Sequence, residues 1–409
     1  MEVIHKRCCG LDVHKKVIVA CLRILKDDGT LLKQVRTYAT TTGALLQLSD
    51  WLAGMDCTHV AMESTGVYWK PVYNVLEGSF ELLLVNAQHM KAVPGRKTDV
   101  KDSEWIAELL QHGLLKGSFV PEAPQRDLRD LTRLCTSLTR EHGRAVNRLQ
   151  KILEDANIKL ASVVSDVMGA SARLMLEAIV AGETNPGLLA DMAKRRLREK
   201  IPQLQEALAG RVKSHHQFMI QELLLHIDDL DASIARLNQE LEKRCAPFEV
   251  ELALLDTIPG INIHKGQEII AEIGVDMSRF GSDARLSSWA AMCPGNNESA
   301  GKRKSGKTRD GNVWLKHSLV GAAHGASHTK DTYLQAQYHR LAGRRGKKKA
   351  IVAVAHSIIV IIYHVLNRLE PYKDLGPNYF DERDQKAVQQ RLVRRLERLG
   401  YQVTLQKVA

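Results

Sequence analysis

The stretch that decides the fold of this chain is CCGLDVHKKVIVA, residues 8–20. Two apolar runs flank the polar His14-Lys15-Lys16, and both have the composition of strands. Asp12 lies inside the first run, where alternation places it at a sheet face beside apolar neighbours. An acidic side chain in such a strand carries a desolvation cost unless it has a partner or a metal ion. This stretch therefore predicts a sheet that carries a functional carboxylate.

Strands and helices alternate around this stretch from residue 8 to residue 120. The predicted strands are 8–13, 17–25, 31–38, 59–63 and 81–85, and the predicted helices are 41–52, 68–76 and 102–111. Asp27-Asp28-Gly29 supplies a hairpin turn between the second and third strands. Three early hairpin-linked strands followed by strand–helix units predict a mixed α/β sheet with helices packed on it.

The remainder of the chain is predicted to be helical. Long amphipathic helices over 127–159 and 212–245 indicate a helical hairpin, an oligomerisation arm or a strut between domains. A mostly helical domain follows, and then a charged helix and tail. The predicted domains are 1–123, 124–247, 248–371 and 372–409.

Composition narrows the partners of the chain. A net charge of +11 over 409 residues favours a polyanionic partner. Seven cysteines without metal-ligand spacing indicate reduced thiols in a cytoplasm. The apolar run 350–366 is interrupted by His356, Ser357 and His364, so we interpret it as a buried helix and expect no membrane association.

Four carboxylates stand out by position. Asp12 lies in a strand, Glu63 ends another strand, and Asp99 and Asp102 are three residues apart where a helix begins. At one sheet edge they could hold two divalent cations, Mg²⁺ or Mn²⁺, because these ions prefer oxygen ligands. Singly, each has a plainer explanation: Asp99 can cap a helix, Asp102 can complement the helix dipole, and Glu63 can be a solvated strand end.

These motifs together resemble a known family. GLDVHKK (10–16), AMESTGVYW (61–69) and KTDVKDSEWIAELL (97–110) are similar to the RuvC-like DEDD domain of insertion-sequence transposases called bridge-RNA-guided recombinases. The resemblance covers almost the whole chain, and it implies that the N-terminal sheet is of the ribonuclease-H-like (RuvC-like) class. It implies that Asp12, Glu63, Asp99 and Asp102 are the catalytic, metal-binding residues.

The C-terminal domain carries two further motifs. Residues 254–261, LLDTIPGI, lead into a predicted helix and have a helix-hairpin-helix-like pattern. The Pro-Gly turn could hold a phosphate or could be a structural turn between packed helices. Residues 294–319 then combine four glycines with clustered cations in a predicted mobile loop, in which the glycines allow close approach to a ligand. The predicted nucleic-acid contacts in this loop are Lys302, Arg303, Lys304, Lys307 and Arg309.

Ser299 lies in the same loop, within NNESAGKRKSG (296–306). By itself it is an ordinary loop serine. The segment resembles the signature of the family's transposase domain, which implies that Ser299 is the nucleophile; Ser305, followed directly by Gly306, is the competing choice. A second basic run, RLAGRRGKKK (340–349), adds Arg344, Arg345, Lys347 and Lys348 as backbone contacts, with a solvated charge run as the alternative.

The resemblance also implies a mechanism and partners. Ser299 forms a phosphoserine link to DNA beside the metal site, and the two sites come from different protomers of a homo-oligomer, a dimer or tetramer. A structured non-coding guide RNA selects donor and target DNA. Two rivals remain from the residues alone: a Holliday-junction resolvase-like nuclease with water as nucleophile, and a non-catalytic nucleic-acid-binding scaffold.

Overall fold

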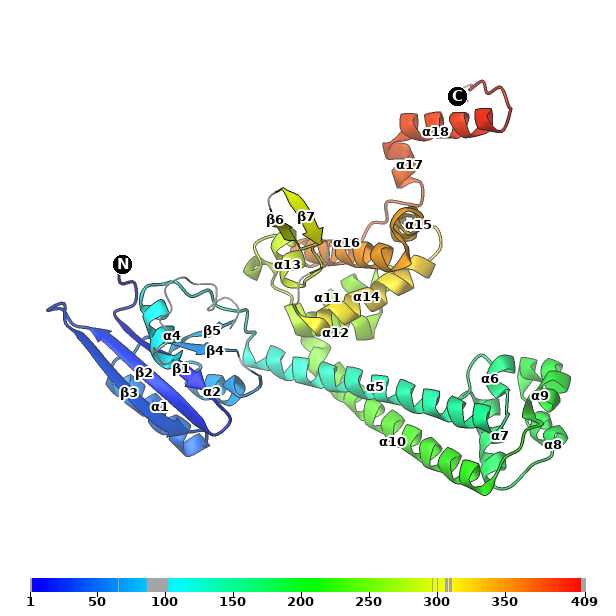
Figure 1. Cartoon of the computed structure of the whole chain (residues 1–409), viewed down its shortest axis with the longest axis horizontal. Coiled ribbons are helices and arrows are strands. Elements are labelled where there is room, and N and C mark those ends of the chain that lie inside the picture. Colours follow the sequence, from blue (N-terminus) through cyan, green and yellow to red (C-terminus); the bar gives the residue numbers. More distant parts are fainter. Residues whose placement is uncertain are drawn as a thin grey trace. The chain divides into compact units, whose positions relative to one another are not determined.

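The chain divides into two compact units, Met1–Ala123 and Pro124–Ala409 (Figure 1). The computed structural model describes residues 2–64, 66–86, 102–295, 297–299, 301–305, 308 and 311–405. For residues 297–299 and 303–305 it describes the backbone. Three predicted site residues, Asp99, Lys307 and Arg309, lie outside the described residues.

The N-terminal unit is built on a five-stranded mixed sheet with the order β3-β2-β1-β4-β5. Its first three strands are antiparallel, whereas β1, β4 and β5 are parallel. The strands are β1 (Arg7–Val13), β2 (Val17–Leu25), β3 (Leu31–Ala39), β4 (His59–Glu63) and β5 (Glu81–Val85). The predicted α/β class with a ribonuclease-H-like mixed sheet is confirmed, and the strand ends agree within one residue.

Helices cover both faces of this sheet. On one face, Cys9, Leu11 and Val13 of β1 pack with α1 (Thr42–Gly54) and α2 (Trp69–Leu76). On the other face, Cys8 of β1, Ala61 of β4 and Val85 of β5 pack with α4 (Asp102–Gln111). The central strands β1 and β4 are buried on both faces and largely apolar, whereas the edge strand β3 is polar and largely exposed.

Gly10 lets α4 approach β1 closely. A Cβ atom on Gly10 would lie 2.3 Å from the backbone nitrogen of Ala107 and 2.4 Å from the carbonyl oxygen of Ser103, both in α4. Ala61, another small residue, is the register partner of Gly10 in β4. The start of α4 is therefore held directly against the centre of the sheet.

The second unit begins with an antiparallel helical hairpin of α5 (Ala123–Asp155) and α10 (Ser214–Cys245), as the apolar spacing predicts. Polar contacts connect the two helices along their length. These pairs are Asp127–Arg244, Cys135–Asn238, His142–Asp231 and Asp155–His216. The Asp127–Arg244 pair is exposed and adds little to stability, whereas His216 of the last pair is buried.

A small helical cap closes the far end of the hairpin. Its elements are α6 (Leu160–Val163), α7 (Ala170–Val180), α8 (Pro186–Asp191), the 3₁₀ helix η1 (Arg195–Lys200) and α9 (Ile201–Leu208). Buried residues of α5 and α10, among them Leu149 and Ile227, join Met175 and Leu204 of the cap in one apolar core. The cap is thus a packed structure, and the region is more than two bare helices.

The C-terminal part of the second unit is helical around a central apolar helix, α16 (Lys347–Arg368). Its elements before that helix are η2 (Ala246–Phe248), α11 (Glu249–Asp256), α12 (Ile263–Ile273), η3 (Met277–Arg279), α13 (Asp283–Trp289), α14 (Val313–His328) and α15 (Tyr333–Arg345). Among the described helices, α16 alone is long and apolar enough to cross a membrane. Its apolar side chains, such as Val354, Ile358 and Ile362, are buried against neighbouring helices, as in a core helix.

The helix-hairpin-helix-like element is formed by α11, the Pro259-Gly260 turn and α12. A Cβ atom on Gly260 would lie 2.1 Å from the carbonyl oxygen of Ala322 in α14. Asn262 caps α12 by accepting a hydrogen bond from the backbone N–H of Lys265. These contacts favour the structural explanation of the turn over phosphate binding.

The segment predicted as a mobile loop contains a β-hairpin. Strands β6 (Asn297–Ser299) and β7 (Lys302–Ser305) pair in antiparallel fashion around Gly301, whose φ of 71° suits a tight turn. The prediction of an irregular loop was wrong here. Glycines and charged residues are typical of loops, and the two short strands have no apolar alternation. The chain then ends with α17 (Tyr379–Arg383) and α18 (Gln385–Arg398).

Candidate functional site

Three of the four predicted carboxylates lie on the same side of the N-terminal sheet. Side chains alternate along a strand, so Asp12 shares the face of Cys8, and Glu63 shares the face of Ala61. Both of those neighbours pack against α4. Asp102 is the first residue of α4, adjacent to the Ser103 carbonyl that lies over Gly10. Parallel pairing of Leu11 with Met62 makes the following residues, Asp12 and Glu63, neighbours at the same sheet edge.

The electrostatics of Asp12 reflect this arrangement. Burial raises the pKa of the Asp12 carboxyl, and the negative charges of Asp102 and Glu63 raise it further. His14 lowers this pKa, because its Nε2 lies 3.1 Å from Asp12 Oδ2. Carboxylates that repel one another at one sheet edge offer oxygen ligands and negative charge to a divalent cation such as Mg²⁺. These donors are of the chemical type that such an ion prefers.

The sequence analysis did not select His14, which contacts Asp12 in the structure. His14 follows Asp12 by two positions and so continues the same side of the strand. Its side chain is 60% exposed, against 24% for Asp12. The available signal was the Asp-x-His spacing at a strand end, which places a carboxylate and an imidazole next to each other.

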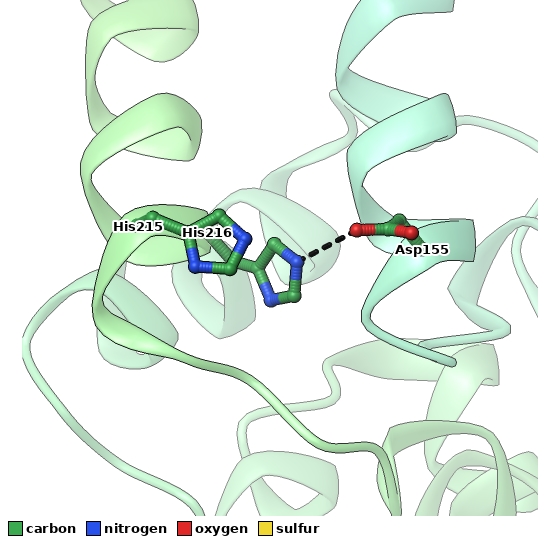
Figure 2. Close-up of side chains that lie close together, drawn as sticks. All are labelled: Asp155, His215 and His216. Carbon is green, nitrogen blue, oxygen red and sulfur yellow. Dashed lines mark hydrogen bonds and ion pairs between the residues drawn. The ribbon is translucent and has the colours of Figure 1, made fainter.

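The closest group of ligating side chains among the described residues lies elsewhere, in the second unit. Ligand atoms of Asp155, His215 and His216 come within 4.8 Å of one another (Figure 2). No other described trio meets this limit, so the oxygens of Asp12, Glu63 and Asp102 are spread more widely than in a closed three-ligand site.

The geometry of His216 argues against a metal ion at that closest group. Its Nε2 lies 2.9 Å from Asp155 Oδ2, and its Nδ1 accepts a hydrogen bond from the Lys213 backbone N–H at 3.2 Å. A metal-bound imidazole uses its other ring nitrogen as a donor, whereas Nδ1 here faces a donor. The group therefore fits a structural His–Asp link between the end of α5 and the start of α10.

Ser299 and its competitor Ser305 occupy different places in the β6–β7 hairpin. Ser299 is the register partner of Lys302, next to the Gly301 turn, whereas Ser305 pairs with Asn297 at the base. Lys302 is exposed, and Arg303 and Lys304 follow it in β7. Ser299 thus lies near the tip of a basic hairpin.

A buried ion-pair network connects α12 to α5. The sequence analysis also missed this network. The Glu272 side chain in α12 is only 3% exposed. Arg133 of α5 binds it with two nitrogens, at 2.7 and 2.8 Å, and Arg129 Nε lies 3.3 Å away. Burial lowers the pKa of Arg129 to about 10, although Glu272 acts to raise it. The only sequence signal was one carboxylate inside the apolar run IIAEI, residues 269–273.

The Glu272 carboxylate also binds Asn312, which lies between the basic loop and α14. Asn312 Nδ2 donates a hydrogen bond to Glu272 Oε2 at 2.6 Å. Asn312 Oδ1 also caps α14 by accepting from Trp314 and Leu315, each at 3.1 Å. A Cβ atom on the preceding Gly311 would lie 2.6 Å from Ala291 Cβ, so the backbone is packed closely there. Gly311 and Asn312, which connect the basic loop to α14, are therefore held in place by packing and hydrogen bonds.

The second basic run lies at the junction of α15 and α16. Arg344 and Arg345 end α15, and Lys347 and Lys348 begin α16; all four are exposed. Cations suit the C-terminus of a helix, but lysines in a first turn oppose the helix dipole. The first turn of α16 contains no acidic residue to offset them. An anionic partner would supply that compensation.

Comparison with known proteins identifies the family of the chain. Residues 9–158 match a transposase family of the DEDD IS110 type, and residues 252–339 match "Transposase IS116/IS110/IS902 family". The chain is 25% identical over 299 residues to the transposase for insertion sequence element IS1111A of Coxiella burnetii (strain RSA 493 / Nine Mile phase I), a match over 71% of this chain and 72% of that protein. The two family matches together span more than half of the chain. It belongs to the IS110 family of transposases.

Each family match contains one of the two sites. Residues 9–158 include Asp12, Glu63, Asp99 and Asp102, and residues 252–339 include Ser299. As an IS110-family transposase, the chain acts on DNA in the movement of an insertion sequence. The family assignment made from the three N-terminal motifs is confirmed.

Proposed function

We propose that this transposase cuts and rejoins DNA strands through a covalent phosphoserine link at Ser299. Asp12, Glu63, Asp99 and Asp102 hold Mg²⁺, or Mn²⁺, beside the scissile phosphate. The observation that carries the proposal is the position of Asp12, Glu63 and Asp102 on the α4 side of one sheet edge. Asp99 is included because it completes the motif.

The reaction exchanges one phosphodiester bond for another. The Ser299 hydroxyl loses its proton and its Oγ forms a bond to phosphorus, while the bond from phosphorus to a bridging DNA oxygen breaks. The leaving oxygen takes up a proton and becomes a strand-end hydroxyl. A hydroxyl of the other DNA then attacks the phosphoserine, and Ser299 recovers its proton. The bound ion supplies stabilisation of the charge on the phosphate oxygens.

The partners are donor and target DNA, a structured non-coding guide RNA and further copies of the chain in a dimer or tetramer. Lys302, Arg303, Lys304, Lys307 and Arg309 near the serine, and Arg344, Arg345, Lys347 and Lys348 at the α15–α16 junction, contact phosphates. We assign residues 1–123 to a RuvC-like domain, 124–247 to oligomerisation, 248–371 to the serine domain and 372–409 to a charged tail. The reaction takes place in the cytoplasm, on the nucleoid.

The test is the capture of a protein–DNA adduct on a plasmid that carries the insertion sequence encoding this chain, with RNA transcribed from its flanking non-coding DNA. Wild type forms a denaturation-resistant adduct in Mg²⁺. Ser299→Ala lowers its yield by roughly 10³-fold or more, since the nucleophile is gone, whereas Ser305→Ala retains it. Asp12→Asn lowers the yield by at least about 100-fold.

Asp28→Asn is the matched control for Asp12→Asn, because Asp28 is an exposed turn residue that binds Thr30. It keeps full adduct yield. Strand cleavage by Ser299→Ala at the wild-type rate would instead identify water as the nucleophile, as in a resolvase. Unchanged DNA processing by Asp12→Asn would contradict any role for the acidic site.

A further inference from the structure

Seven residues in the cap of the helical hairpin carry an unusual concentration of positive charge. Residues 194–200 read KRRLREK, and all five cations are exposed. They lie in and just before η1 (Arg195–Lys200), far along the sequence from both proposed catalytic sites. We call Lys194, Arg195, Arg196, Arg198 and Lys200 the cap cluster.

The charge of the cap cluster is not neutralised within the part of the chain that the structure describes. The side chains of Lys194, Arg195 and Arg196 have no ion-pair partner among the described residues. Two other members are held by backbone carbonyl oxygens: Arg198 by Asp191 and Ala193, each at 3.3 Å, and Lys200 by Val163 at 3.2 Å. Such bonds orient the cations and leave their full charge available.

The cluster faces a hollow of suitable size. A cavity of about 570 Å³ is lined by Lys194, Arg195, Arg196 and Lys200 on one side and by the first turn of α7 on another. Its single acidic lining residue, Asp166, already accepts a hydrogen bond from the Met168 backbone N–H at 2.9 Å. Four cations and one carboxylate give the cavity a net positive field, to which the N-terminus of α7 adds.

The backbone of Lys194 and Arg195, on the cationic side of the cavity, is held in place by α7. The Lys194 backbone N–H donates a hydrogen bond to the hydroxyl of Ser171 in α7, at 3.0 Å, and Ser171 is 9% exposed. Arg195 adopts a positive φ of 52°, which turns the chain sharply as η1 begins. The Cα positions of these cations are thus set by a backbone that is anchored to α7.

We infer that the cap cluster binds phosphate groups of a nucleic-acid backbone, as a contact separate from both catalytic sites. Phosphodiester oxygens match unpaired arginine and lysine side chains, and no aromatic residue lines the cavity to stack a base. The inference rests on the nucleic-acid function of the family, and it does not depend on the serine chemistry. The contact is independent of sequence, because it reads the backbone only.

The experiment measures binding without cleavage, in EDTA, by fluorescence anisotropy. The probes are a 30-base-pair DNA duplex and a structured RNA transcribed from the flanking non-coding DNA, each titrated between 50 and 200 mM salt. The test variant is the full chain with Arg195→Gln and Arg196→Gln. Its control is Arg236→Gln with Lys243→Gln, which removes the same charge from exposed positions on α10.

We expect the test variant to bind about tenfold more weakly and to lower the slope of log K against log salt by about 2, while the control matches wild type. The probe that shows the effect, DNA or RNA, identifies the source of the phosphates. Equal affinity and slope in the test and control variants would overturn the inference alone. Failure of wild type to bind either probe would overturn the nucleic-acid function as well.

Discussion

The acidic site and the serine hairpin are built in opposite ways. Asp12, Glu63 and Asp102 are far apart in the sequence, and regular elements bring them to one sheet edge. Ser299 and its basic neighbours are close together in the sequence. The loop that carries them is followed by Asn312, which binds Glu272, and Glu272 in turn binds Arg133, a residue distant in the chain. The acidic site brings together residues that are dispersed in the sequence, whereas the serine segment carries neighbouring residues and is held by distant ones. Substitutions in the two scaffolds should therefore have different consequences.

The largest effect is expected from the anchor of the serine segment. Glu272→Gln removes the charge that pairs with Arg133 and Arg129, and both guanidinium groups are largely buried. Breaking a buried ion pair from one side costs about 3–5 kcal/mol. Urea unfolding followed by circular dichroism measures the loss. Glu240→Gln, which breaks an exposed pair with Arg244 on α10, leaves the unfolding midpoint unchanged.

A smaller loss from Glu272→Gln would mean that the network is not a tight anchor. A second measurement on Glu272→Gln compares the loss of DNA–protein adduct with the loss of folded protein at the assay temperature. The informative result is an adduct yield that falls more than the folded fraction. That result would show that the anchor positions the hairpin in addition to stabilising the domain.

A moderate effect is expected from the scaffold of the acidic site. Gly10→Ala adds a Cβ atom that would lie 2.3 Å from the backbone of α4, so the helix must move. Overpacking of this kind costs about 1–3 kcal/mol. Because Asp102 begins that helix, the Mg²⁺ concentration required for adduct formation should also rise. Thermal unfolding and a Mg²⁺ titration measure the two effects.

Gly143→Ala is the matched control for Gly10→Ala. Gly143 lies in α5, and an added Cβ would meet no heavy atom within 4 Å. It should stabilise the chain by about 0.5–1 kcal/mol, because glycine disfavours the helix interior. If Gly10→Ala behaved like Gly143→Ala, the close contact between β1 and α4 would not be what positions Asp102.

The smallest effect on folding is expected at the α15–α16 junction. Lys347→Gln with Lys348→Gln removes two cations from a helix N-terminus, which should raise the melting temperature by about 1 °C. The same change should lower the salt slope of DNA binding by about 2, if these lysines contact phosphates. Arg344→Gln with Arg345→Gln should weaken binding equally without the gain in stability. Unchanged binding in both variants would favour a solvated charge run.

Much of the N-terminal fold was predictable because its signals are local. Apolar runs of strand length and the Asp28-Gly29 turn located all five strands. The carboxylates were predictable as candidates because strand alternation and helix starts are visible in sequence. The β6–β7 hairpin was missed, since its three- and four-residue strands, NES and KRKS, are polar and carry no apolar pattern.

The sequence by itself determined which face of its strand each side chain takes, because alternation with a period of two is a local property of the backbone. Only the tertiary structure decided that α4 lies on the face of Asp12 and Glu63, since that depends on the close approach at Gly10. It also decided that Glu272 has Arg133 as its partner, 139 residues away. Contacts at such separation depend on how whole elements pack, and no local pattern encodes them.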